Sequence, residues 1–491
     1  MDVMLTYDRE KIDGLGSKDV MKLIQKHMAK VVPDLQRNMD YYMGKQAITA
    51  KERTATAANV TAPNAQPVCN HAKDIADTAS SYFLGTPLSY SRKAGEAEDA
   101  AKQAAFDALL DALDKATTDD DDQENALMLS ICGKTYEYIY IAEGAAELRE
   151  KPIDPQNAFI VYDQSIEHSE LFGVYYYQKT NDLDENAKEP DTYFIVMTET
   201  ELKYYKVPAG SGEVEVLPYK IEPHNLGQIP LIEYKNNRFA IGDFSQQIGL
   251  IDAYNTMTAD RINDKEQFID AILVIYGAML GETEKESDEA LENLKAKKLL
   301  ELPEDNARAE YLTRQLDENG MEVLRDALKE DIYTFSHVPN LTDENFAGNS
   351  SGVAMEYKLL GLEMLTKTKE RWYRRGLRKR IEIFIYFLGL KGAQLAESDI
   401  EITFSRALPK NLLELSQIVN YLADDLTLKT RLSLLPFIED PEAEAEAVEA
   451  EKQANVIRQQ EFFASTSTET GQENSEPEDG AASGYDDNSG E

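Results

Sequence analysis

The residues of this chain that could do chemistry are scattered, and none completes a catalytic motif. Gly133, Lys134 and Thr135 match the end of a phosphate-binding P-loop. That motif also needs a glycine five residues before Gly133, where the sequence has Met128. The three residues lie at the start of a predicted strand and not between a strand and a helix. We therefore interpret Gly133 as the residue that ends a helix before a sheet begins.

Four consecutive acids, Asp119–Asp122, raise the question of a cation site. An EF-hand loop alternates its ligands and has a mid-loop glycine and a terminal glutamate, and this run lacks all three features. Acidic side chains are also common in the first turn of a helix, where the helix dipole stabilises them. The run therefore predicts a solvated helix N-terminus and no bound cation.

Histidine and cysteine give no catalytic or metal-binding pattern. The chain has five histidines: His27, His71, His168, His224 and His337. They include no pair at i,i+4 and no HExxH motif, and the chain has no GxSxG or kinase signature. Cys69 and Cys132 are too few for a disulfide scaffold or a multi-cysteine zinc site and fit a reducing compartment. We interpret them as buried structural thiols, and we expect no enzyme activity, no metal and no cofactor.

One basic cluster stands out between residues 367 and 380. It contains Lys367, Lys369, Arg371, Arg374, Arg375, Arg378, Lys379 and Arg380. On a helix, four of these share one face, and they form a possible basic stripe: Lys367, Arg371, Arg374 and Arg378. The stripe could face phosphate or a partner, or it could be neutralised by acids of this chain or of a neighbouring copy. The acidic composition of the chain favours the second interpretation.

The chain has 491 residues and a mass of 55.2 kDa, enough for about two to four domains with a large core. An apolar fraction of 42% with 26 Tyr and 16 Phe excludes a wholly disordered chain. Its 90 acidic residues exceed its 51 Lys and Arg, which gives a net charge of −39. Such a surface repels DNA, so the chain is not a general nucleic-acid binder.

No targeting or membrane-spanning segment is predicted. Met1–Lys11 has three acids and no apolar core, unlike a signal peptide. The longest apolar runs, Ala271–Leu280 and Ile383–Leu390, fall far short of the roughly 20 residues that cross a bilayer. We expect an intracellular, soluble product.

The elements that must position these residues change in period along the chain. Helices are predicted at Ser17–Val31, Asp34–Gly44, His71–Leu84, Glu96–Ala116 and Asp121–Cys132, with a polar loop over 45–68. Strands are predicted at Thr135–Ile141, Phe159–Tyr162, Phe172–Lys179, Thr192–Glu199, Glu201–Val207, Val214–Ile221 and Leu231–Lys235. Together they predict a helical N-terminus followed by a largely antiparallel sheet.

The second half is helical again. A long helix begins at Asp243, and neither Gly nor Pro interrupts residues 250–276. Further helices are predicted at Ser287–Lys295, Glu322–Phe335, Gly352–Phe387, Asn411–Phe437 and Glu439–Glu461, and strands at Lys298–Leu302, Ala309–Thr313 and Asp399–Arg406. Gly361 and Gly376 are possible bend points of the longest helix. Residues 465–491 are polar and acidic without Lys or Arg, which predicts disorder.

Four segments carry a family resemblance. They are YYMGKQ (41–46), NHAKDIADTASSYFLGTPLSY (70–90), NNRFAIGDFSQQIGLIDAYNTMTADRINDKEQFIDAILVIYG (236–277) and FSHVPNLTDENFAGNSSGVAMEYKLLGLEMLTKTKERWYRRGL (335–377). Each resembles the portal proteins of long-tailed bacteriophages of Gram-positive hosts. A single segment is a weak signal, but four in this order over most of the chain are specific.

The resemblance implies a ring of about twelve copies at one vertex of a phage capsid, through which double-stranded DNA is packaged and ejected. It implies a docking platform for the large terminase and for head-completion or adaptor proteins. Scaffolding and major capsid proteins are further implied partners, and no membrane is involved. The protein would then belong to the virion, after assembly in the host cytoplasm. ATP hydrolysis would belong to the terminase, which agrees with the missing P-loop.

The resemblance also implies an α+β, ring-forming portal fold. Its parts map to the following residues: wing 1–242, first stem helix 243–270, small α/β clip 271–317, second stem helix 318–335, tunnel loop 336–351, long helix and returning wing strand 352–407, helical crown 408–464 and acidic disordered tail 465–491. The elements predicted from the sequence fit this order.

Within this layout the tunnel loop is the expected DNA-contacting site. Its implied channel residues are Val338, Pro339, Asn340, Thr342, Asp343, Asn345, Gly348, Asn349 and Ser350. Residues 338–351 contain no Lys or Arg, so they can touch a duplex through polar groups without a strong ionic grip. Gly348 and Gly352 allow the loop to change shape.

Two other functions stay open at this stage. One is a capsid-associated structural ring that does not conduct DNA. The other is a metal-dependent nuclease built on scattered carboxylates, which the abundance of acids makes hard to test by sequence. A stem that is stable only against neighbouring copies would favour the portal.

Overall fold

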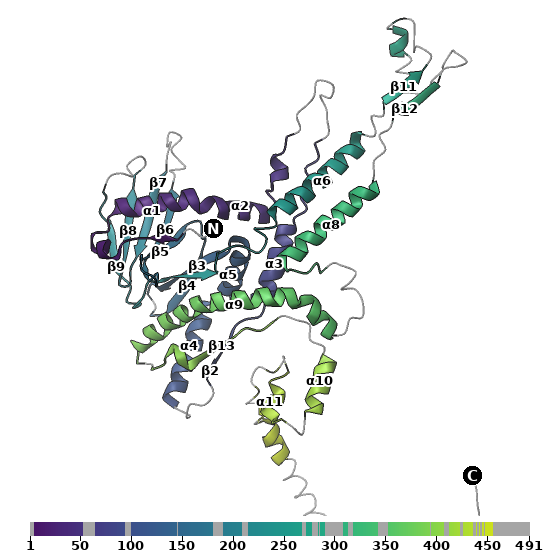
Figure 1. Cartoon of the computed structure of the whole chain (residues 1–491). Helices are drawn as coiled ribbons and strands as arrows, with labels where there is room; N and C mark the ends of the chain where they lie inside the picture. The colour runs from purple at the N-terminus through teal and green to yellow at the C-terminus, as the bar shows by residue number, and fades with distance from the viewer. Residues whose placement is uncertain are drawn as a thin grey trace, which may run out of the picture. The chain divides into compact units, whose positions relative to one another are not determined.

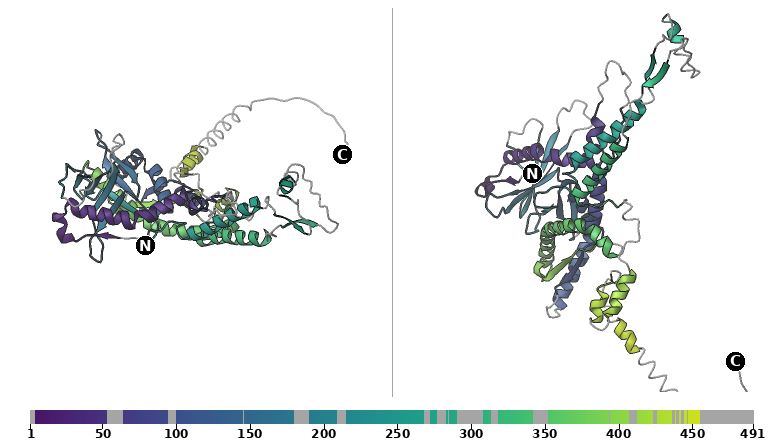
Figure 2. Two further views of the ribbon diagram at one scale, coloured as in Figure 1. Left: turned by 90° about the horizontal axis from the view of Figure 1, so that it is seen from above. Right: turned by 45° about the vertical axis from the view of Figure 1, so that its right-hand side comes forward.

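The computed structural model describes residues 4–52, 64–93, 100–144, 146–179, 190–208, 215–267, 272–276, 283, 285–289, 308–312, 318–341, 352–392, 394–406, 412–422, 426–435, 438, 441, 444–445 and 447–454. The chain divides into two compact units, Met1–Leu408 and Pro409–Glu491. Figures 1 and 2 show the elements of both units. No described helix has the length and apolar character needed to span a membrane.

The five predicted N-terminal helices are confirmed, four of them with shifted ends. They are α1 (Ser17–Lys30), α2 (Val32–Tyr42), α3 (His71–Leu84), α4 (Ala100–Ala116) and α5 (Thr118–Cys132). The predicted bounds of α3 are matched at both ends, because the Asn70 side chain caps the helix by accepting a hydrogen bond from the Lys73 N–H at 3.1 Å. Short 3-10 helices, η1 (Arg9–Gly14) and η2 (Ala47–Ala50), precede α1 and α3.

Two sheets follow, both built mainly from hairpins. The first has the order β1-β5-β6-β7-β8-β9, from β1 (Leu5–Thr6), β5 (Ala158–Tyr162), β6 (Glu170–Lys179), β7 (Asp191–Met197), β8 (Glu201–Val207) and β9 (Lys220–Pro223). The second has the order β10-β3-β4, from β10 (Leu231–Lys235), β3 (Lys134–Ile141) and β4 (Leu148–Ile153). All pairs are antiparallel except β1 with β5, which confirms the predicted hairpin character.

One strand prediction was wrong, and a strand of the second sheet was missed. Val214–Ile221 was predicted as one strand, but β9 begins only at Lys220, and residues 215–219 include Pro218, which has no N–H to donate to a ladder. β4 was missed because its sequence, LREKPI, mixes charge and proline into the alternating pattern.

Distant segments pair at β2 (Ser89–Arg92) and β13 (Ile400–Thr403). They are antiparallel, with Tyr90 opposite Ile402. The strand predicted at Asp399–Arg406 therefore exists in shortened form. It follows the short 3-10 helix η5 (Glu397–Asp399).

A pair of helices, α6 (Ile248–Gln267) and α8 (Glu318–Ser336), runs side by side (Figures 1 and 2). Between them in sequence, β11 (Ile272–Tyr276) pairs antiparallel with β12 (Arg308–Leu312). The uninterrupted helical pattern through residue 276 was thus misleading: ILVIY is rich in β-branched residues and forms a strand. The predicted strand at Ala309–Thr313 is confirmed as β12, whereas Lys298–Leu302 lies outside the described residues.

The second unit contains α10 (Leu412–Tyr421) and α11 (Leu428–Leu432), so the predicted Asn411–Phe437 helix is divided. The Thr427 side chain caps α11 by accepting a hydrogen bond from the Thr430 N–H at 3.3 Å. Residues 447–454 are helical, as predicted. The predicted disordered tail, 465–491, lies outside the described residues.

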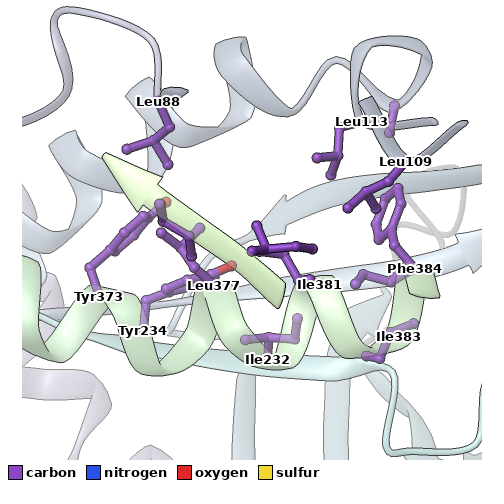
Figure 3. Close-up of a cluster of buried hydrophobic side chains, with 14 of the residues drawn as sticks. Leu88, Leu109, Leu113, Ile232, Tyr234, Tyr373, Leu377, Ile381, Ile383 and Phe384 are labelled. Atoms are coloured by element: carbon purple, nitrogen blue, oxygen red, sulfur yellow. The ribbon is translucent and has the colours of Figure 1, made fainter. Parts of the chain in front are cut away.

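The longest helix, α9 (Gly352–Gly389), passes through the core of the first unit. Its buried side chains recur at three- and four-residue steps: Tyr373, Leu377, Ile381 and Phe384. Figure 3 shows them with Ile232 and Tyr234 of β10 and with Leu109 and Leu113 of α4. The packed face of α9 thus joins the three-stranded sheet to the N-terminal helices.

Gly376 packs closely against another side chain of the core. A Cβ at this position would lie 2.4 Å from a ring carbon of Tyr234, closer than any real contact. That ring is fully buried and stacked on Tyr373, with ring centroids 4.4 Å apart, so it has little room to move. At Gly361 the nearest atom to an added Cβ would be the His337 carbonyl oxygen at 3.5 Å, an ordinary contact.

Gly376→Ala should therefore lower the free energy of unfolding by about 1–3 kcal/mol through overpacking. Gly361→Ala is the matched control on the same helix, and it should be neutral or slightly stabilising because alanine favours helix. Urea denaturation followed by circular dichroism measures both. Equal stability of the two variants would contradict the close packing of Gly376 on Tyr234.

Candidate functional site

The structure divides the basic cluster of α9 into two sets. Three members point into the first unit and are buried or nearly so: Lys369, Lys379 and Arg380. The others are exposed or half-exposed: Lys367, Arg371, Arg374, Arg375 and Arg378. Only the second set could meet a partner in this form of the chain.

Arg380 has no exposed surface and is surrounded by three acids. Its Nη1 and Nη2 donate to the two carboxylate oxygens of Asp122 at 3.0 and 2.7 Å. Its Nε donates to Glu137 Oε1 at 3.0 Å and lies 3.2 Å from Glu150 Oε2. Because Asp122 is on α5, Glu137 on β3 and Glu150 on β4, one guanidinium fixes α9 to three other elements.

One positive charge among three buried acids leaves an imbalance. Burial raises the pKa of Glu150 well above its usual range, with the Arg380 charge only partly opposing this. Among the described residues, no group donates a hydrogen bond to either Glu150 carboxyl oxygen. Burial likewise raises the pKa of Asp122, against the opposing effect of Arg380. Of the three acids, Glu150 therefore has the least support for its charged form.

This cluster corrects the prediction for Asp119–Asp122. Asp119 and Asp120 are exposed as expected, but Asp121 and Asp122 are buried, so the run is not a solvated helix N-terminus throughout. Burial raises the pKa of Asp121 to about 6. Sequence gave no signal of the pairing, because Asp122 and Arg380 are 258 positions apart. No group of three or more His, Cys, Asp or Glu in the described part of the chain is arranged to hold a metal.

Asp243 forms a second junction beneath α9. Its carboxylate contacts the buried Lys369 Nζ and accepts hydrogen bonds from Ser130 Oγ at 2.6 Å and from Asn236 Nδ2 at 2.9 Å. Lys379 makes a third contact, with Glu170 and with the Leu231 carbonyl oxygen at 3.0 Å. These contacts connect α9 to α5, to the segment before α6 and to both sheets.

The thiols and the most buried histidine have structural surroundings. Cys132 is buried as predicted, and burial raises its pKa to about 12. Cys69 is only half-buried. His27 is buried beside Tyr176, with Nδ1 2.9 Å from the hydroxyl oxygen, and burial lowers its pKa to about 3. Neither Cys132 nor His27 has the exposure that a nucleophile or a general base needs.

The predicted basic stripe makes contacts within this chain. Lys367 pairs with Glu363 at 3.5 Å, and Arg378 pairs with Glu397 at 3.2 Å. Arg374 donates to the Ile402 carbonyl oxygen at 2.8 Å and covers the Phe404 ring, while Arg371 is exposed. These contacts favour neutralisation by the chain's own acids. Exposed pairs of this kind contribute about 0–1 kcal/mol, so they are easily exchanged.

The predicted channel segment is described only at its start. Val338 is 1% exposed and packs with Ile332 of α8 and Leu362 of α9. Its N–H donates to Ser336 Oγ at 3.2 Å, and Pro339 and Asn340 are half-buried. Val338 therefore anchors this segment between the two helices. The other predicted channel residues lie outside the described residues: Thr342, Asp343, Asn345, Gly348, Asn349 and Ser350.

Large apolar side chains are exposed along α8 and at the start of α9, which the sequence analysis did not anticipate. On α8 they are Val323, Leu324 and Phe335, and on the N-terminal part of α9 they are Tyr357, Leu360 and Met364. Val323, for example, is 71% exposed and Tyr357 74%. Exposed large apolar side chains of this kind are candidates for contact with another molecule.

Arg380→Met should lower the free energy of unfolding by about 3–5 kcal/mol, because it leaves buried acids without a counter-charge. Arg378→Met, on the same helix but in an exposed ion pair, should cost about 0–1 kcal/mol. Denaturant unfolding compares the two. Similar losses would show that Arg380 is not the main ionic contact of α9.

Glu150→Gln should stabilise the protein, and more at pH 8 than at pH 5. Folding raises the pKa of Glu150, so its favourable contribution is complete only below the unfolded value of about 4.3. That contribution is lost as pH rises toward the folded pKa. Glutamine keeps the shape of the neutral acid without this loss. Thermal unfolding of both proteins from pH 5 to 8 measures the difference, and parallel pH curves would contradict the raised pKa.

The phage portal protein family described as SPP1 Gp6-like matches residues 21–457 of this chain. The portal protein of Bacillus phage SPP1 is 22% identical over 466 residues, covering 89% of this chain and 88% of the relative. The portal protein of Clostridium phage phiCD119 is 24% identical over 342 residues, covering 67% and 73% respectively.

One solved structure, the neck of an empty GTA particle computed with C6 symmetry, contains a similar chain. Its TM-score is 0.45 at 12% identity, over 74% of this chain and 89% of that one. The matched residues of the family include most of α1, all of α2 to α11, the buried Arg380 junction and the anchored segment after α8. The resemblance seen in the four sequence segments is confirmed, and the chain belongs to the phage portal protein family.

Proposed function

We propose that about twelve copies of this chain form a ring at one capsid vertex, and that double-stranded DNA passes through the ring during packaging and ejection. The observation that carries this proposal is the family match over residues 21–457. Portal proteins are structural components of the phage capsid that assemble as rings, and they are not enzymes. Docking of the large terminase, of head-completion or adaptor proteins, and of scaffolding and major capsid proteins is part of the same proposal.

The layout of the subunit is proposed from the family. The wing would comprise residues 1–242 with β13 added through β2, and the stem would comprise α6 and α8. The clip would contain β11 and β12, and the crown would contain α10 and α11. In support, α8 and the start of α9 expose apolar side chains that a neighbouring copy in a closed ring would cover.

The net negative charge of the chain favours passage of DNA without tight binding. A net charge of −39 raises the electrostatic potential against phosphate, whereas a wall of Lys and Arg would hold the duplex tightly. The basic stripe does not alter this, since Lys367 and Arg378 already pair with acids. We propose that the duplex is touched mainly by the loop over 336–351, whose start is held by Val338.

Ring formation can be tested by mass photometry and negative-stain microscopy of the purified chain across concentration. The wild type should give rings of about twelve copies with an axial hole. Val323→Asp combined with Leu324→Asp should leave folded monomers, because both side chains are exposed on α8. Ile166→Asp changes a 99% exposed side chain elsewhere and should leave rings intact. A stable monomer of wild type at every concentration would overturn the ring.

DNA passage has a separate test in a packaging assay. Asn345→Lys with Asn349→Lys adds two charges to the proposed channel loop and should slow translocation, most strongly at low salt. Asn345→Gln with Asn349→Gln keeps the amide and should behave like the wild type. Equal packaging by rings of both double variants would contradict contact between this loop and the duplex, whereas wild-type rings that support no packaging would favour a structural ring that does not conduct DNA.

A further inference from the structure

A pocket of about 600 Å³ lies between α9, β10 and the residues that follow β10. Its apolar lining includes Met4, Ile232, Phe239 and Trp372, and its charged lining includes Arg238 and Arg375. The volume is within the range of about 300–1,000 Å³ that is typical of binding pockets. Val338, Pro339 and Asn340, the channel residues that the structure describes, are not among its lining.

The inner charges of the pocket compensate one another. Lys379 pairs with Glu170, and Lys235 Nζ lies 3.2 Å from Glu233 Oε2. The Glu233 side chain is only 8% exposed and also accepts a hydrogen bond from the Tyr136 hydroxyl at 2.9 Å. The floor of the pocket therefore carries no net charge that would repel or attract a ligand.

The two arginines at the rim differ from these inner residues. The Arg375 guanidinium carbon lies 4.2 Å from the Trp372 ring centroid, and that of Arg238 lies 5.9 Å from the Phe239 centroid. Both arginines are exposed, and neither forms an ion pair with a carboxylate among the residues that the structure describes. In a chain with 90 acids and 51 basic residues, this leaves a local positive surplus beside apolar surface.

We propose that this pocket binds an acidic peptide segment of a partner protein, with carboxylates on Arg238 and Arg375 and an apolar side chain between Phe239 and Trp372. Arginine pairs with carboxylates through parallel hydrogen bonds, and aromatic and arginine side chains are the commonest anchors of protein interfaces. This inference goes beyond the proposed function and depends neither on the ring nor on DNA passage.

Single-stranded nucleic acid is the less favoured ligand on two grounds. Base stacking needs open aromatic faces, but a guanidinium already covers one face of each ring. The acidic chain also repels a polyphosphate more strongly than a short peptide with a few carboxylates.

Trp372 makes the pocket directly measurable, since it is the only tryptophan of the chain. The full chain is titrated with the peptide Glu-Glu-Phe-Glu-Glu-Leu-Glu-Glu while Trp372 emission is followed. A saturable change is expected, and the same peptide with every Glu replaced by Gln should give none. Arg238→Gln with Arg375→Gln should weaken binding by about tenfold or more.

Arg371→Gln with Arg378→Gln removes the same charge from the same region, outside the pocket, and should bind the peptide like the wild type. If both double variants weaken peptide binding equally, the effect comes from the overall charge of the region, and the proposed site is wrong. Tighter binding of a short oligo(dT) than of the acidic peptide would assign the pocket to nucleic acid instead. The absence of a saturable change with the peptide would also reject the proposal. A change in Trp372 emission that depends on protein concentration alone would reject it too, and would indicate that a second copy of the chain occupies the pocket.

Discussion

The fold depends most on a charge that never meets solvent. Arg380 holds α5, β3, β4 and α9 at one point, and these elements come from residues 118 to 389 of the chain. A guanidinium so placed is costly to desolvate, and only good geometry to its acids offsets that cost. The arrangement therefore permits one register of α9 against the sheet. Gly376, four residues before Arg380, packs so closely on Tyr234 that it favours the same register sterically.

This register also decides what α9 can present outside. Because Lys369, Lys379 and Arg380 turn inward, the remaining basic residues form an outer face on the same helix. Part of that face is satisfied by Glu363 and Glu397, and part borders the pocket at Trp372. A single basic segment of the sequence thus supplies buried ion pairs, exposed ion pairs and the positive charge at the rim of the Trp372 pocket.

Much of the secondary structure could be predicted, for reasons that are local. His71–Leu84 has its cap in Asn70 and its stop in Gly85, and β6, β7 and β8 are short segments rich in aromatic and β-branched residues. Ile272–Tyr276 could not be assigned correctly, because a short apolar run fits a helix or a strand until its partner, β12, is known. The Asp122–Arg380 pair and the Trp372 pocket could not be predicted from the sequence either. Each depends on side chains that meet only after helices and sheets pack, and no spacing in the sequence encodes that meeting.

The pairing of β2 with β13 joins two distant segments of the first unit. Ser89–Arg92 and Ile400–Thr403 are neighbours in space although about three hundred residues separate them in the chain. The chain from α4 to α9 therefore begins and ends at this strand pair. That segment includes the α6–α8 pair and the paired strands β11 and β12. The β11–β12 region is then a place where insertions, deletions or even a break in the chain leave the two halves of the unit joined.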